Sequence, residues 1–148
     1  MSSNDRELAL RNKALLQRHF DAINSWDFAA MREIFHPAIK LELPFVVDPF
    51  PKSVEGFDNV MAFMESVPEF AEEENLYDFT ISSFAEDPNE LVAEYVSDMK
   101  LKSGREYKNT YVVRVTIKDG KMVRFREYFD GIKLLESMGG HIVPPENS

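Results

Sequence analysis

Glu127 is the residue whose position most directly indicates chemistry. It lies in a segment, residues 121–129, in which apolar and basic residues alternate as in a strand with one buried face. This alternation predicts that Val123, Phe125, Glu127 and Phe129 share the apolar face. An ionised, unpaired carboxylate is costly to bury, so Glu127 is expected to be paired, to keep its proton or to face a ligand cavity. The structural alternatives are a frayed strand end or an ion pair with a buried Arg.

Polar side chains from the two preceding strands are expected on the same face. If three-residue loops join the strands, Glu127 lies opposite Val113, and Val113 lies opposite Tyr95. An apolar concavity with a few convergent polar groups is typical of a small-molecule site. The expected ligand contacts are Tyr95, Tyr107, Asn109 and Tyr111, with Phe45, Phe63 and Phe129 as apolar walls.

The N-terminal part of the chain is predicted to be mainly helical. Residues 4–24 carry apolar side chains near helical spacing, and Asn4, three residues before Glu7, resembles the start of a capping box. A second, short helix is expected to begin with Asp27 as its N-cap. Alternation over residues 39–45 then predicts a strand that runs into a Pro-rich loop.

The C-terminal half is predicted to be a series of strands. A third helix is expected after Gly56, and from about Leu76 onward the apolar period is that of strands. Turn-forming residues such as Asp119 and Gly120 separate these strands, which indicates consecutive antiparallel hairpins. We therefore predict the α+β class, with a curved, mostly antiparallel sheet packed on three N-terminal helices, and a single domain over residues 1–148.

Composition excludes several classes of partner. The 148-residue chain has a net charge of −9 with scattered basic residues, which argues against nucleic acid and anionic membranes. It contains 12 Phe, enough to fill a core and line a cavity, and no Cys. No apolar stretch is long enough to span a bilayer, and the N-terminus lacks a signal-peptide core. We expect a soluble, cytoplasmic protein that uses no metal and no cofactor, because no ligand spacing or phosphate-binding motif is visible.

Two stretches of the sequence carry a family resemblance that covers nearly the whole chain. RHFDAINSWDFAAMREIF at 18–35 and KDGKMVRFREYFD at 118–130 resemble the SnoaL-like branch of the nuclear-transport-factor-2-like, or ketosteroid-isomerase-like, superfamily. The resemblance implies a cone-shaped sheet wrapped around helices, a ligand cavity at the open end, and a homodimer. Within the superfamily the C-terminal half is similar to the phenazine-biosynthesis A/B proteins, at Asp87, Pro88, Asn89, Tyr107, Asn109, Asp119, Gly120, Arg126, Glu127, Tyr128, Leu135 and Gly139.

The chain departs from the ketosteroid isomerases at their catalytic positions. Their general-base Asp falls at Leu43, their oxyanion-hole Tyr at His19, and their protonated Asp near Val112. A leucine cannot move a proton, so steroid isomerisation by that mechanism is not expected. His19 is left as a proton donor or a hydrogen-bond partner of Glu127, with a satisfied or solvated side chain as the alternative.

The phenazine-type resemblance preserves more of the site. It implies an acid/base role for Glu127 and a polar contact for Tyr107, while the family's pocket His falls at or near Phe63. On a flat ladder Tyr107 would lie roughly 20 Å from Glu127, so the pair requires a strongly curled sheet.

Three functions follow as alternatives. The first, which we favour, is a cofactor-independent enzyme of secondary metabolism that acts on a small cyclic or polyketide-like compound with Glu127 as acid/base. The second is a binding protein that holds a hydrophobic ligand without turnover. The third is an interaction module whose cavity is filled by Phe45, Phe63 and Phe129.

Overall fold

The computed structural model describes residues 2–147, which fold as α helices packed on one large sheet. The elements are α1 (Ser3–Ser25), α2 (Phe28–Ile34), β1 (Phe35–Glu42), β2 (Ser53–Glu55), α3 (Phe57–Ser66), the 3-10 turn η1 (Val67–Glu69), β3 (Ala71–Glu73), β4 (Leu76–Phe84), β5 (Asp87–Leu101), β6 (Glu106–Lys118), β7 (Lys121–Phe129) and α4 (Gly131–Ser137). The α+β class predicted from the sequence is confirmed.

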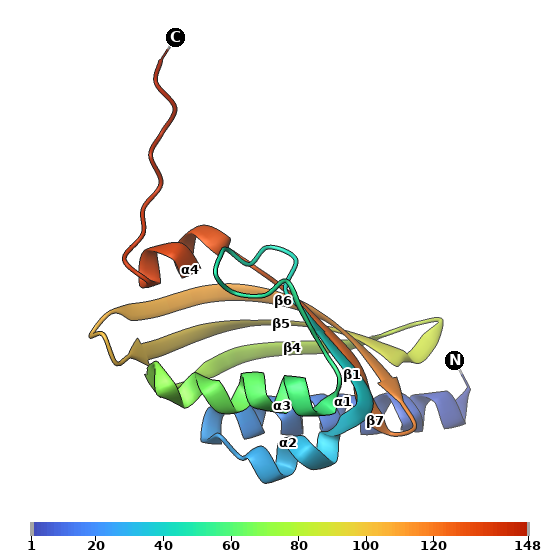
Figure 1. Ribbon diagram of the computed structural model, residues 1–148. Coiled ribbons are helices and arrows are strands. Elements are labelled where there is room, and N and C mark those ends of the chain that lie inside the picture. The colour runs from blue at the N-terminus through green and yellow to red at the C-terminus, as the bar shows by residue number, and fades with distance from the viewer. Residues whose placement is uncertain (1, 148) are drawn as a thin grey trace.

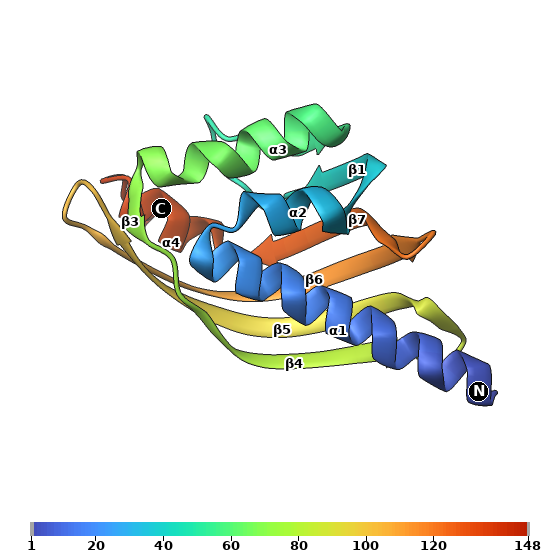
Figure 2. The same ribbon diagram turned by 90° about the horizontal axis from the view of Figure 1, so that it is seen from below.

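The sheet arches over the helices. Figure 1 shows β4, β5 and β6 curving above α1, α2 and α3, and Figure 2 shows these helices lying across the inner face. Within residues 2–147, seven strands pair in the order β2-β1-β7-β6-β5-β3, with β4 also paired to β5. The pairs are antiparallel except β1 with β7, which run parallel. The short α4 packs on β6 near one end of the sheet.

Local sequence signals explain the helix boundaries. Ser2 caps α1 and forms a capping box with Asp5, so the expected start at Asn4 was wrong by two residues. Asp27 caps α2 through a bond from the backbone N–H of Ala30 (3.0 Å), as predicted. Of the helices formed by residues 2–147, none combines the length and apolar character needed to cross a membrane.

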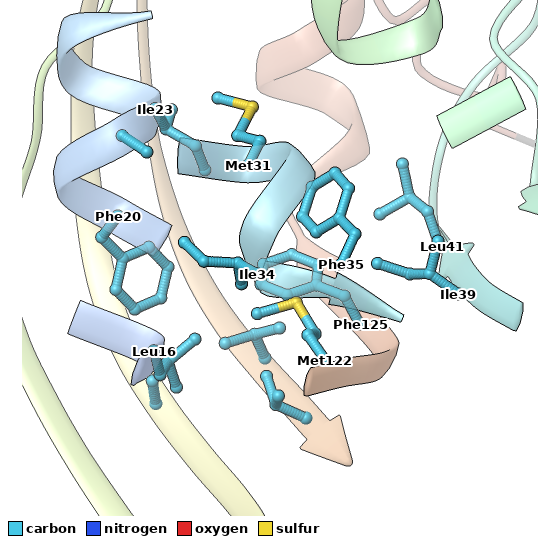
Figure 3. Packing of buried hydrophobic residues seen from close by; sticks show 14 of the residues in the cluster. Leu16, Phe20, Ile23, Met31, Ile34, Phe35, Ile39, Leu41, Met122 and Phe125 are labelled. Carbon is cyan, nitrogen blue, oxygen red and sulfur yellow. The ribbon is translucent and has the colours of Figure 1, made fainter. Parts of the chain in front are cut away.

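The core lies between the helices α1 and α2 and the inner face of the sheet, with residues from β1, β5, β6 and β7. Leu16 and Phe20, four residues apart on α1, are fully buried against the inner face. Figure 3 shows these two side chains with Ile23, Met31, Ile34, Phe35, Ile39, Leu41, Met122 and Phe125. These side chains come from α1, α2, β1 and β7, so they join the helices to the sheet.

The β6–β7 hairpin differs in detail from the prediction. Asp119 and Gly120 form a two-residue turn, both with positive φ (54° and 71°), where a three-residue loop was expected. A bulge at Val123 supplies the missing residue, so Met122 instead of Val123 faces the core. The turn and the bulge together leave Glu127 opposite Val113, as predicted.

The β5–β6 register differs from the prediction by two residues. Tyr95 lies opposite Tyr111, not Val113, because the turn after β5 is centred on Ser103, one residue earlier than the predicted pairing requires. A slip of two residues keeps every side chain on its expected face, so the inward set is unchanged.

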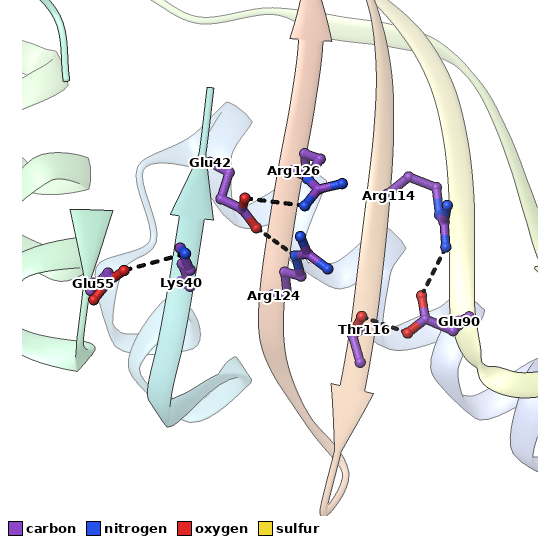
Figure 4. Close-up of polar contacts among 8 residues, drawn as sticks. All are labelled: Lys40, Glu42, Glu55, Glu90, Arg114, Thr116, Arg124 and Arg126. Carbon is purple, nitrogen blue, oxygen red and sulfur yellow. Dashed lines mark hydrogen bonds and ion pairs between the residues drawn. The ribbon is translucent and has the colours of Figure 1, made fainter. Parts of the chain in front are cut away.

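The outer face of the sheet carries ion pairs. Glu42 of β1 accepts bonds from Arg124 and Arg126 of β7, and Glu90 accepts from Arg114 (3.3 Å) across β5 and β6 (Figure 4). Val112 lies on the same face and is 37% exposed. The homodimer implied by the family resemblance stays a prediction.

Candidate functional site

A cavity of about 170 Å³ lies between the helices and the inner face of the sheet. Its walls come from α1, α3, α4, η1, the strands β1, β4, β5, β6 and β7 and the segments that join them, and most of the lining side chains are apolar. The polar members of the lining are His19, Glu74, Tyr107, Tyr111 and Glu127. A dry cavity of about 150 Å³ holds a benzene molecule, so this one has room for a ligand with one or two small rings.

Glu127 enters the cavity from β7, and its carboxylate accepts a hydrogen bond from the hydroxyl of Tyr95 on β5. Burial raises the pKa of Glu127 from 4.5 to about 7, although the bond from Tyr95 works in the opposite direction. Burial also raises the pKa of Tyr95 well above 10, so this hydroxyl stays protonated and acts as the hydrogen-bond donor to Glu127. Near neutral pH Glu127 therefore populates both the acid and the base form.

Glu74 is a second carboxyl in the cavity, and the sequence reasoning missed it. It lies between β3 and β4 and accepts a hydrogen bond from the indole Nε1–H of Trp26 (3.2 Å). Burial raises the pKa of Glu74 to about 7, and the charge of Glu127 contributes to the rise. Glu74 ends a run of three acidic residues, 72–74, in which Glu72 and Glu73 are exposed. The sequence pattern therefore did not distinguish Glu74 from its exposed neighbours.

His19 lines the cavity but is enclosed by aromatic rings. Its side chain is 3% exposed, and its ring centre lies 5.2 Å from that of Phe125 and 5.5 Å from that of Phe35. Burial lowers the pKa of His19 to about 3, so the ring is neutral at physiological pH. Within the described part of the chain, its buried Nδ1 has no hydrogen-bond partner. Tyr95, not His19, is the partner of Glu127, and a neutral ring is a poor proton donor.

Asn109 holds Tyr107, one of the two cavity tyrosines, in place by hydrogen bonds on the side away from the cavity. Its Nδ2 donates to the hydroxyl of Tyr107 (2.8 Å) and to the carbonyl of Asp130 (3.0 Å), and its Oδ1 accepts from the backbone N–H of Asp130 (3.1 Å) and of Thr110 (2.8 Å). Burial raises the pKa of Tyr107 to about 12. Because the Tyr107 oxygen accepts from Asn109, its own O–H is left to donate elsewhere.

Tyr111 is the other tyrosine of the cavity. Its hydroxyl forms a hydrogen bond of 2.8 Å with that of Ser97 on β5. Burial raises its pKa far above the ordinary value, so Tyr111 is neutral. The curl of the sheet brings Tyr107 and Glu127 to one cavity, although they are far apart along a flat ladder.

Six of the nine residues proposed from the sequence line this cavity, namely His19, Phe63, Tyr107, Tyr111, Glu127 and Phe129. Tyr95 and Asn109 lie directly behind it. Phe45 lies outside: it is 60% exposed and packs on the ring of Tyr128. The reason is that β1 ends at Glu42 and the backbone then turns, with Val46 N–H bonded to the Leu43 carbonyl (3.1 Å), so strand alternation does not continue to Phe45. Leu43 and Val46 line the cavity in its place.

Across residues 2–147 no three His, Asp or Glu side chains are grouped so as to hold a metal ion.

Comparison with known proteins identifies related chains and folds. The family model described as SnoaL-like domain matches residues 16–125. The uncharacterised protein YesE of Bacillus subtilis is 25% identical over 125 residues, which are 82% of this chain and 83% of YesE. The uncharacterised PhzA/B-like protein PA3332 of Pseudomonas aeruginosa is 25% identical over 131 residues, 86% of this chain and 90% of that protein.

A solved structure supports the same fold. The phenazine biosynthesis-related protein of Pseudomonas aeruginosa superposes with a TM-score of 0.79 at 18% identity, covering 97% of this chain and 95% of that one.

Proposed function

This chain belongs to the SnoaL-like family, and we propose that it is a cofactor-independent enzyme of the isomerase, cyclase or condensation type. Its substrate is a small cyclic or polyketide-like compound. The observation that carries the proposal is the carboxyl of Glu127, half-buried at the wall of an apolar cavity, with a pKa raised to about 7 by burial. The fold similarity to a phenazine biosynthesis-related protein supports the same general class of chemistry.

In this proposal Glu127 takes a proton from the substrate and returns it at another position. A general acid/base works best when its pKa lies near the working pH, because both forms are then available. Tyr107 and Tyr111 keep their protons, so their hydroxyls orient a substrate carbonyl by hydrogen bonding. The apolar walls exclude water and strengthen these polar contacts.

The position of the carboxyl separates this proposal from steroid isomerisation. Leu43, where the ketosteroid isomerases are expected to have their general base, lines the cavity as an apolar residue. Glu127 comes instead from β7, where Arg126 pairs with Glu42 directly before Leu43, so the carboxyl is supplied by the neighbouring strand.

A screen for turnover tests the proposal. Cyclic ketones and polyketide-like compounds are incubated with the protein, with Glu127→Gln, and with the control Glu94→Gln, which changes an exposed carboxyl on β5. We expect Glu127→Gln to lose about 100-fold or more of any activity found, and the control to keep it. Unchanged turnover in Glu127→Gln would rule out Glu127 as the catalytic group.

The second candidate is a binding protein without turnover. It is favoured by the neutral state of His19 and by Phe63, which stands where the phenazine-type proteins are expected to have a pocket His. Tight ligand binding that survives Glu127→Gln, with no product after long incubation, would support this candidate against the enzyme.

A further inference from the structure

The ionisable groups on the cavity wall are negative or neutral. Glu74 and Glu127 supply two carboxyls, and among the described residues that line the cavity none is Lys or Arg. His19 adds no positive charge, because burial lowers its pKa to about 3. Tyr107 and Tyr111 are neutral, since burial raises the pKa of both hydroxyls. An ionised carboxylate in this cavity therefore has no cation of the wall beside it.

The groups that contact the two carboxyls are neutral donors. The hydroxyl of Tyr95 bonds to Glu127, and the indole of Trp26 bonds to Glu74 at 3.2 Å. The arginines of β6 and β7 lie on the outer face of the sheet, where Glu42 and Glu90 hold them (Figure 4). Burying a carboxylate is costly unless it is protonated or a positive charge compensates it, so a cation brought by the ligand would stabilise the ionised form of these two groups.

Aromatic rings line the same cavity. Besides Tyr107 and Tyr111, its walls include Phe35, Phe63, Phe125 and Phe129. The faces of such rings attract organic ammonium groups, and the attraction is larger where water is excluded. A strongly hydrated inorganic ion would lose its water shell against these walls, whereas a ring carrying an ammonium group also gains apolar contact.

We propose that the cavity takes a small ring compound carrying a protonated amine, with the ammonium group bound by the carboxylates of Glu74 and Glu127. This inference rests on the proposed function and names its substrate class. It also predicts that ring compounds carrying a carboxylate are rejected, because an anion would meet two like charges and no basic side chain of the wall.

The test is a series of three probes matched in size and differing in charge. Binding of benzylamine, benzyl alcohol and benzoate is measured by calorimetry on the full chain at about pH 7.5. We expect benzylamine to bind at least about tenfold more tightly than benzyl alcohol, and benzoate to bind more weakly than both. Equal binding of amine and alcohol, tighter binding of benzoate, or no binding by any probe at millimolar concentration would overturn the inference.

Two variants and a control locate the effect. Glu74→Gln and Glu127→Gln are each expected to reduce the preference for benzylamine over benzyl alcohol by about fivefold or more, since each removes one of the two charges. Glu73→Gln, which changes an exposed neighbour of Glu74, is expected to keep the full preference. Thermal unfolding of each variant confirms that it is folded. A preference unchanged in both cavity variants would contradict the assignment.

The outcomes separate this inference from the proposed enzyme. If Glu127→Gln abolishes turnover of a neutral compound while benzylamine shows no preference, the amine inference fails and the acid/base role stands. If benzylamine is preferred but no compound is turned over, the amine inference stands and the binding-protein candidate is favoured.

Discussion

Tyr95 donates a hydrogen bond to the carboxylate of Glu127 across the width of strand β6. The donor comes from β5 and the acceptor from β7, so the contact depends on the register of three strands. Two effects act on Glu127 in opposite directions: burial raises its pKa, and the bond from Tyr95 stabilises its ionised form. The balance places its pKa at about 7.

Tyr95→Phe is expected to raise the pKa of Glu127 above about 7, because it removes the donor and keeps the burial. A bond to an ionised group contributes on the order of 2 kcal/mol, so the rise should be about one unit or more. The measurement is a carbon-13 NMR titration of the Glu127 carboxyl. Tyr111→Phe is the control, because the Tyr111 hydroxyl bonds to Ser97 and not to Glu127. A lower pKa in Tyr95→Phe would contradict the role given to this bond.

Glu127→Gln is expected to stabilise the protein increasingly as the pH rises from about 4.5 to about 7. Below that range Glu127 is protonated in both the folded and the unfolded state. Within it, the unfolded chain loses the proton first, because the folded pKa is raised, so the wild type loses stability. The full shift corresponds to at most roughly 3 kcal/mol. Urea unfolding of both proteins at pH values across this range measures the difference, and a difference independent of pH would count against the raised pKa.

The fold was predictable where local signals decide the structure. Asp27 caps α2 because its side chain bonds to a backbone N–H three residues on, which the sequence reveals directly. The bulge at Val123 and the two-residue slip between Tyr95 and Val113 were not predictable, because packing across the sheet decides where a turn is centred and where a bulge forms. The set of inward-facing residues on β5 and β6 was still predicted correctly, because side chains alternate with a period of two and a slip of two residues keeps each on its face.

The site was predictable from strand alternation but not from loops. Glu127, Tyr107 and Tyr111 lie on regular strands, so their inward direction followed from the pattern. Glu74 was missed and Phe45 was misplaced because both lie outside the strands, where no period fixes the direction of a side chain. The neutral state of His19 also required the structure, since it results from the rings that surround it.

Glu127→Gln is also expected to lower the pKa of Glu74 from about 7, because the charge of Glu127 contributes to that rise. The pKa of Glu74 should stay above 4.5, because burial is its larger cause and remains. Carbon-13 titration of the Glu74 carboxyl measures this, with Glu73→Gln as a control that leaves the cavity charges unchanged. An unaltered pKa for Glu74 would mean that the two carboxyls do not interact.

Asn109→Ala is expected to lower the free energy of unfolding by about 2–4 kcal/mol. The side chain is 3% exposed, and its removal leaves the backbone N–H groups of Thr110 and Asp130 without their acceptor. Urea unfolding measures the loss. Thr110→Ala, at an exposed side chain on the same strand, should change stability by less than about 0.5 kcal/mol. Similar losses in the two variants would show that the Asn109 network does not hold Tyr107 in place.

The pKa of Glu127 in the wild-type protein is the most direct test of the central claim, that this carboxyl faces a desolvated cavity and is poised for acid/base work. A carbon-13 NMR titration gives it, with the resonance assigned by its loss in Glu127→Gln. We predict a pKa of about 7, well above the ordinary 4.5, because burial outweighs the bond from Tyr95. A value at or below 4.5 would mean an exposed or ion-paired carboxylate and would contradict the acid/base role.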